Sequence, residues 1–132
     1  MAAKIFFNFL VVALGGALGS VCRYASSLMF TVPGNNLPWG TLLANLVGSL
    51  VIGFVMELAT IKAGLAPELR LFLVTGFCGG LTTLSSLVFE ANSLGRDREF
   101  LLALGYGLGT LIGAFVALWA GMLLCRLLFL RN

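Results

Sequence analysis

The sequence contains no histidine, only three cysteines and few charged residues in a chain of 132 residues. Without histidine, imidazole metal sites and histidine proton relays are excluded. Cys22, Cys78 and Cys125 are odd in number and lack metal-ligand spacing, so we expect them to pack as small hydrophobic side chains. The net charge of +3 includes no basic run, so no nucleic-acid partner is expected.

Most of the sequence is apolar instead. Hydrophobic residues make up 60%, charged residues 10%, and the mean hydropathy is +1.07. A soluble domain of this size has no interior large enough for so much apolar surface, which indicates an integral membrane protein. One spanning helix takes about 20 residues, so we predict a single all-α transmembrane domain over 1–132. Its four spans, in contact with the lipid bilayer, are expected at 5–30, 39–60, 69–93 and 100–128.

The third span contains an unusual stretch, residues 76–87. Gly79 and Gly80 are adjacent, and four hydroxyl residues follow within the next six positions. This composition disfavours an unbroken helix, and irregular backbone in a membrane persists only when it is buried in protein or lines a wet cavity. We predict a helix break whose backbone carbonyls can hold a cation. The alternative is a bent but continuous helix whose small residues let a neighbour pack closely.

Three polar side chains in the first two spans allow more than one interpretation. Arg23 lies seven residues before the first span ends and is either a snorkelling anchor or part of an anion-accessible vestibule. Asn45 shares one helical face with Thr41 and Ser49. Its amide either bonds a neighbouring helix or presents N–H donors to a permeating anion. Glu57 lies near the end of its span and is expected to be an interfacial carboxylate.

The later spans carry two further patterns. Thr82, Ser86 and Glu90 recur every four residues and share one face of the second half of the third span. Tyr106 and Thr110 are the only hydroxyl side chains of the fourth span. Small residues at four-residue spacing in that span predict the close approach of a partner helix. They are Gly105, Gly109, Gly113, Ala117 and Gly121.

Charge outside the spans biases the orientation only weakly. An even number of spans places both termini on one side of the membrane. That side carries five cations, which are Lys4, Lys62, Arg70, Arg126 and Arg131, and the other side carries three, which are Arg23, Arg96 and Arg98. Five against three is a small difference under the positive-inside rule, so insertion in both orientations is permitted.

Three ordered motifs are similar to those of the small bacterial fluoride channels of the Fluc (CrcB) family. They are the glycines and Arg-Tyr pair within 15–24, GTLLANL at 40–46, and TGFCGGLTT at 75–83 followed by Glu90. The resemblance spans almost the whole chain. It implies a channel, not an enzyme, that lets fluoride leave the cell passively across the bacterial inner membrane and so lowers cytoplasmic fluoride.

The resemblance also implies an assembly and a set of site residues. Two four-helix subunits would form a dual-topology dimer, one inverted against the other, with two fluoride pores. A structural sodium ion would be held at the centre by the backbone carbonyls of Gly79 and Thr82 from both subunits. The fluoride pathway would include Asn45, Ser86, Leu84, Leu87, Tyr106 and Thr110, and the vestibule would include Arg23 and Glu90.

The chain departs from the family pattern at the pore. Leu84 and Leu87 occupy positions where the family has phenylalanines that present ring edges to fluoride, and a leucine has no polarised edge. Ala114 and Leu118 replace later hydroxyl residues of the fourth span. Three explanations stay open: a leucine variant that still conducts as a homodimer, one half of a heterodimer with a homologous subunit, or an accessory subunit with a sealed pore.

One competing hypothesis comes from another class of transporter. A proton-coupled small multidrug exporter has the same size and number of helices. Such an exporter needs a titratable carboxylate deep within a span, whereas the first span here has none. Flux measurements in liposomes distinguish the three functions. A channel gives fluoride efflux, an exporter gives drug-coupled proton flux, and an accessory subunit gives neither.

Overall fold

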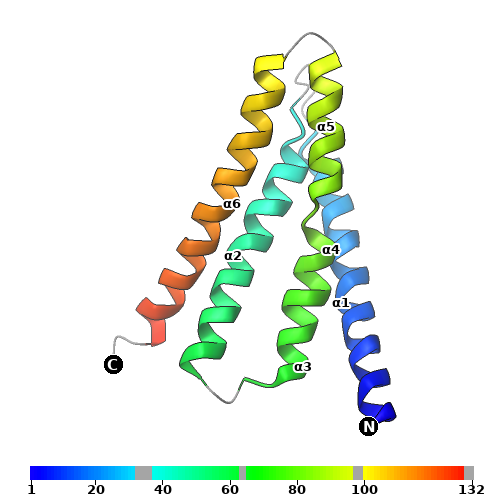
Figure 1. Cartoon of the computed structure of the whole chain (residues 1–132), viewed down its shortest axis with the longest axis vertical. Coiled ribbons are helices and arrows are strands. Elements are labelled where there is room, and N and C mark those ends of the chain that lie inside the picture. The colour runs from blue at the N-terminus through cyan, green and yellow to red at the C-terminus, as the bar shows by residue number, and fades with distance from the viewer. Residues whose placement is uncertain (32–36, 63–64, 97–99, 130–132) are drawn as a thin grey trace.

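The computed structural model describes residues 1–31, 37–62, 65–96 and 100–129, apart from the side chain of Arg96. Within these ranges the regular structure is entirely helical (Figure 1). The elements in chain order are α1 (Ala2–Met29), α2 (Trp39–Ile61), α3 (Pro67–Arg70), the π-helix η1 (Leu71–Cys78), α4 (Gly79–Leu81), α5 (Leu84–Arg96) and α6 (Phe100–Phe129). Four helical spans are long and apolar enough to cross a membrane, which confirms the predicted all-α membrane fold.

The third span, which comprises α3, η1, α4 and α5, changes its neighbour halfway along its length. Its first half, η1 and α4, packs against α1, whereas α5 packs against α6. The most extensive helix pair is α2 with α6, which run side by side in Figure 1. In the same view α1 begins and α6 ends at the lower end of the bundle, as four spans require.

Glycines allow these helices to approach almost backbone to backbone. A Cβ atom added at Gly15 or Gly19 of α1 would lie 2.5 or 2.0 Å from a carbonyl oxygen of η1. Between α2 and α6 the contacts are reciprocal: a Cβ on Gly53 would lie 2.0 Å from a carbonyl oxygen of α6, and one on Gly121 would lie 2.1 Å from a carbonyl oxygen of α2. Close backbone contact is a main source of helix association in lipid, which lacks a hydrophobic driving force between helices.

The predicted small-residue ridge of the fourth span is used only in part. Gly121 contacts α2 closely, and a Cβ at Gly113 would lie 2.9 Å from a side-chain carbon of Leu46. A Cβ at Gly105 or Gly109 would meet nothing within 4 Å. Four-residue spacing therefore identifies the face but does not show where along it a neighbour lies.

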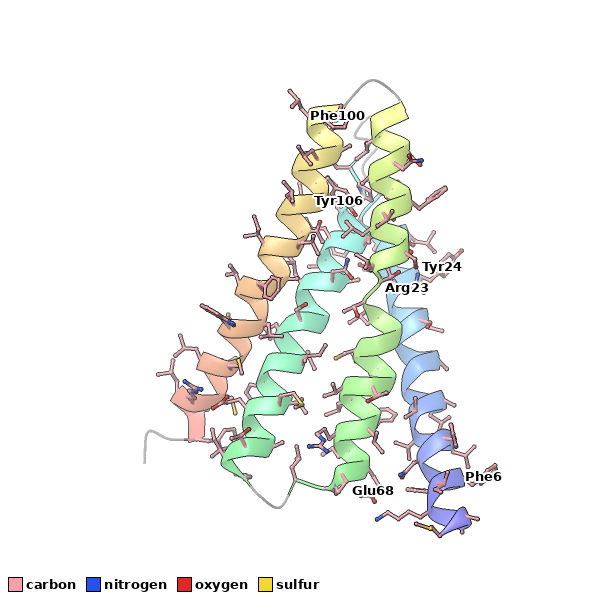
Figure 2. The ribbon with its side chains drawn as sticks, in the orientation of Figure 1. Phe6, Arg23, Tyr24, Glu68, Phe100 and Tyr106 are labelled. Atoms are coloured by element: carbon pink, nitrogen blue, oxygen red, sulfur yellow. The ribbon has the colours of Figure 1, made fainter. Side chains whose placement is uncertain are left out.

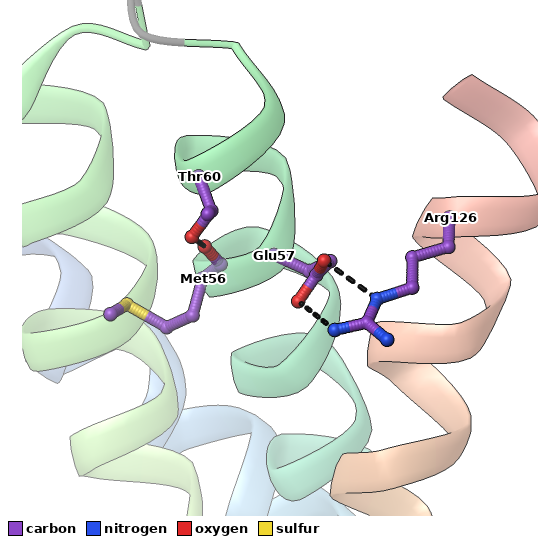
Figure 3. A network of polar contacts seen from close by, with 4 residues as sticks. All are labelled: Met56, Glu57, Thr60 and Arg126. Atoms are coloured by element: carbon purple, nitrogen blue, oxygen red, sulfur yellow. Dashed lines mark hydrogen bonds and ion pairs between the residues drawn. The ribbon is translucent and has the colours of Figure 1, made fainter. Parts of the chain in front are cut away.

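Glu57 differs from its sequence-based expectation. Glu57 is only 7% exposed, so the prediction of an interfacial carboxylate in preference to a buried one is wrong. Arg126 of α6 donates two hydrogen bonds to this carboxylate (Figure 3). They run from Nε to Oε1 at 2.8 Å and from Nη2 to Oε2 at 3.4 Å. A carboxylate this buried requires a partner, and α6 supplies one.

The charge comparison across the membrane extends beyond the described residues. Arg98, Arg131 and the side chain of Arg96 lie outside them. On the terminal side, the Lys62 ammonium lies 4.5 Å from the ring centroid of Phe129, and Lys4 pairs with Glu68 at 3.8 Å. Both cations thus have partners at the ends of the helices. The contacts do not change the predicted difference of five cations against three between the two sides of the membrane.

The glycine contacts lead to a first prediction. Gly121→Ala should separate α2 from α6 and destabilise the fold by about 1–3 kcal/mol, the usual cost of overpacking. Gly107→Ala is the matched control, because a Cβ there meets nothing within 4 Å and alanine favours the helix by up to about 1 kcal/mol. Thermal unfolding in detergent measures both. Equal unfolding temperatures for the two variants would contradict the packing argument.

Candidate functional site

The third span breaks at two threonines, after the glycines that suggested a break. Gly79 and Gly80 are helical, whereas Thr82 is extended, with φ −84° and ψ 150°, and α5 begins at Leu84. Gly80 serves a different purpose, since a Cβ there would lie 2.4 Å from the Gly16 carbonyl oxygen of α1. The helix is broken at the threonines, so the alternative of a continuous helix is wrong, although the close packing that it expected is present at Gly80. That the break holds a cation stays a prediction.

Asn45 of α2 satisfies the backbone that the break exposes. Its Oδ1 accepts the Thr83 N–H at 2.8 Å, and its Nδ2 donates to the Thr83 carbonyl at 3.3 Å. Asn45 is 7% exposed, so both bonds are shielded from solvent and lipid. A carboxamide has two N–H donors, and within the described part of the chain the second makes no hydrogen bond.

Thr83 also caps α5. Its Oγ1 accepts the Ser86 N–H at 3.2 Å, the usual bond of an N-cap threonine to the third helical residue. The hydroxyls of Ser85 and Ser86 lie 3.1 and 3.3 Å from the same oxygen. The N-terminus of α5 carries a partial positive charge and is therefore surrounded by the hydroxyls of Thr83, Ser85 and Ser86. Thr83 was not among the predicted site residues, although its type and position before a helix could have indicated a cap.

The break removes the helical donors of several carbonyls, among them those of Gly79 and Thr82. In a continuous helix the Gly79 carbonyl would accept the Thr83 N–H, and the Thr82 carbonyl would accept the Ser86 N–H. Asn45 takes the first of these donors and the Thr83 hydroxyl takes the second. Among the described residues neither carbonyl has another donor, which is costly at membrane depth.

Residue exposure favours Gly79 over Leu81 as a cation ligand, and Thr82 is half-buried. The Leu81 carbonyl also lacks a donor among the described residues, but Leu81 is 5% exposed and packs between α1 and α2. Gly79 is exposed, and a Cβ there would meet only the Val74 carbonyl oxygen, at 3.8 Å. Backbone carbonyls at a broken membrane helix are suitable ligands for a monovalent cation. The donor set therefore fits such an ion.

Arg23 reaches the break from α1. Its Nε donates to the Gly80 carbonyl at 3.2 Å, and Figure 2 shows the side chain beside the third span. Arg23 is half-buried, and no carboxylate of the described residues lies within ion-pair distance of it. From the sequence, Arg23 was expected to be either an anchor or a vestibule residue. Its acceptor, the Gly80 carbonyl of α4, could not be predicted from α1 alone.

Glu90 joins three helices beyond the break. Its two carboxylate oxygens accept hydrogen bonds from the Thr41 hydroxyl of α2 at 2.6 Å and the Tyr106 hydroxyl of α6 at 2.7 Å. The Thr110 hydroxyl donates to the Tyr106 carbonyl at 2.7 Å, and Thr110 is 2% exposed. The hydroxyl protons of the predicted polar track are thus engaged within the chain.

A groove of about 190 Å³ lies between α2, the break and α6. Its lining comprises Asn45, Ser49, Thr82, Thr83, Leu84, Leu87, Thr110, Leu111 and Ala114. The two leucines differ in environment: Leu84 is 65% exposed, whereas Leu87 is 4% exposed and belongs to the core cluster with Tyr106. The groove therefore collects most of the predicted pathway residues and is open on the side of Leu84.

Comparisons with known proteins agree with the geometry. The family model described as "CrcB-like protein, Camphor Resistance (CrcB)" matches residues 10–122. A protein of Chlorobium phaeobacteroides (strain DSM 266) named "Fluoride-specific ion channel FluC" is 46% identical over 127 residues, which cover 96% of this chain and 98% of the relative. A protein of the same name from Agrobacterium fabrum is 44% identical over 123 residues, 92% of this chain and 98% of the relative.

The role of Asn45 leads to a second prediction. Asn45→Leu keeps similar volume but leaves the N–H and carbonyl of Thr83 without partners, at about 1–3 kcal/mol for each group. We expect a clear loss of thermal stability in detergent and faster hydrogen exchange at the Thr83 amide. Ser49→Ala is the control, since Ser49 lines the same groove one turn later on α2. Unchanged exchange at Thr83 in the leucine variant would show that Asn45 does not hold the break.

Proposed function

This chain belongs to the CrcB family, and from that membership we propose that it is a fluoride channel that lets fluoride leave the cell passively. It is a multi-pass protein of the bacterial plasma membrane, with apolar helices in contact with lipid. The observation that best supports conduction is the groove in which Asn45 and the N-terminus of α5 meet at membrane depth. Both present N–H groups, which are the donors that an anion requires.

Fluoride would move along the groove by exchanging hydration water for protein donors. Such an ion is strongly hydrated, so crossing a narrow region requires replacement donors. The second N–H of Asn45 is available without breaking a bond to the chain. Tyr106 and Thr110 can donate to fluoride only when their hydroxyls turn away from Glu90 and from the Tyr106 carbonyl. Ser86, whose hydroxyl accepts from Thr83 at the cap of α5, is a further candidate donor.

A second subunit would complete the pathway. The groove is open beside Leu84, Gly79 is exposed, and the Gly79 carbonyl has no donor among the described residues. An inverted copy packed on this face would close the groove and bring a second pair of carbonyls to the first. The carbonyls of Gly79 and Thr82 in both copies would then hold a structural sodium ion, whose charge would stabilise these oxygens. A heterodimer with a homologous subunit would satisfy the same geometry.

The described carboxylates give the exporter hypothesis no support. Glu57 is held by Arg126, and both oxygens of Glu90 accept hydroxyl donors. A proton-coupled exporter would need one of these groups to exchange a proton for a cationic drug within the membrane.

Reconstitution of the purified chain into liposomes tests the channel. A fluoride electrode should record fluoride efflux that exceeds chloride efflux and needs no proton gradient. Empty liposomes are the control. If efflux occurs only after a homologous subunit is added, the channel is a heterodimer and not a homodimer. Absence of fluoride efflux under both conditions would refute the channel.

The environments of the two leucines lead to a further prediction. Leu84→Phe should fit at the open side of the groove and supply a ring edge, worth about 1 kcal/mol and so roughly a fivefold rise in fluoride flux. Leu87→Phe must instead overpack a residue that is 4% exposed and should destabilise the fold by about 1–3 kcal/mol.

Val88→Phe is the control for an added ring on the same half-helix, because Val88 is 59% exposed and does not line the groove. Flux is measured with the fluoride electrode and stability by thermal unfolding. An equal rise in flux for the Leu84 and Val88 variants, or none for either, would show that a ring edge in the groove does not assist fluoride.

A further inference from the structure

The break would leave the Gly80 carbonyl without a donor if α1 did not supply one. In a continuous helix this carbonyl would accept the N–H of Leu84, which here lies beyond the break at the start of α5. The Arg23 Nε occupies the carbonyl instead, at 3.2 Å. Gly80 is also fixed in place, because its Cα packs so closely on α1 that a Cβ would lie 2.4 Å from the Gly16 carbonyl oxygen.

This bond determines which carbonyls remain for an ion. Gly79 and Thr82 have no donor from the described chain, whereas the intervening Gly80 carbonyl is held by the guanidinium. In a two-copy site, Gly79 and Thr82 would supply four backbone oxygens. Release of Gly80 in both copies would raise the number to six. The number and field strength of carbonyl ligands are among the properties that select one monovalent cation over another.

We propose that Arg23 is a positioning residue that sets the cation preference of the third-helix break by holding the Gly80 carbonyl out of the ligand set. The inference rests on the sodium site that forms part of the proposed function. It assigns the effect to the Nε donor of Arg23, whereas a vestibule residue would act through its positive charge. The two roles therefore respond differently to substitutions that separate donor from charge.

Two variants separate the donor from the charge, and a third removes both. Arg23→Gln places an amide nitrogen at the same number of bonds from Cα as Nε and removes the charge. Arg23→Met has similar reach but neither donor nor charge. Arg23→Lys keeps the charge but moves the donor one bond further out. Lys4→Met on the same helix is the control for loss of a cation, since Lys4 lies far along α1 and pairs with Glu68.

The readout is thermal stability of the purified dimer in detergent, titrated with sodium chloride or potassium chloride. For the unmodified chain we expect the half-maximal concentration for sodium to be about tenfold lower than that for potassium. The Gln variant and the Lys4 control should keep this preference. The Met variant should lose most of it, to less than about threefold, because the freed Gly80 carbonyl admits the larger ion.

Several results would overturn the inference. An equal loss of the preference for sodium in the Gln and Met variants would show that the charge of Arg23, and not its donor, sets the preference. An unchanged preference in the Met variant would show that the Gly80 carbonyl plays no part. If the Met variant does not assemble, a high-resolution map of the unmodified dimer decides. A central cation in contact with Gly79 and Thr82 but not with Gly80 supports the inference, and contact with Gly80 refutes it.

Fluoride efflux of the unmodified chain, measured in parallel, keeps this test distinct from that of the channel. Efflux without any sodium preference would refute the role of Arg23 and leave the channel proposal in place. A sodium preference that follows the donor, without efflux from the chain alone or with a homologous subunit, would support the role of Arg23 and refute the channel.

Discussion

The requirement that every backbone polar group in a membrane find a partner governs the centre of this protein. Breaking the third span at Thr82 and Thr83 frees several such groups, and different helices satisfy them. Asn45 of α2 pairs with both backbone groups of Thr83, and Arg23 of α1 takes the Gly80 carbonyl. Among the described residues the carbonyls of Gly79 and Thr82 have no donor. The break thus creates the candidate site and binds its surroundings together.

Close packing makes these long-range bonds possible. Arg23 can reach the third span because glycines bring α1 near η1 and α4. Asn45 can reach it because Gly48 of α2 faces Thr82: a Cβ added at Gly48 would lie 2.3 Å from the Thr82 methyl carbon. Helices in lipid gain little from burying apolar side chains, so contact between backbones contributes much of their association. The small residues of the sequence therefore serve the site indirectly, by setting the spacing of the helices that bear its polar groups.

The sequence predicted the parts of this arrangement that depend on local composition. Four apolar spans, a broken third span and a polar face around Asn45 follow from hydropathy, helix propensity and periodicity. The position of the break could not be predicted, because the flexible glycines are helical where α1 packs on them. The acceptor of Arg23 and the burial of Glu57 also depend on helices distant in sequence. The same holds for the different environments of Leu84 and Leu87, which periodicity places on one face.

The ion pair between Glu57 and Arg126 has a consequence for biosynthesis. Its members are 69 residues apart, and the cation lies in the last turn of the last helix. The ribosome therefore releases α2 long before the partner of its carboxylate exists, and a lone charge within a bilayer costs about 3 kcal/mol on insertion scales. Until α6 arrives, Glu57 must stay at the membrane surface. Completion of the chain is then what allows the second helix to settle at its final depth.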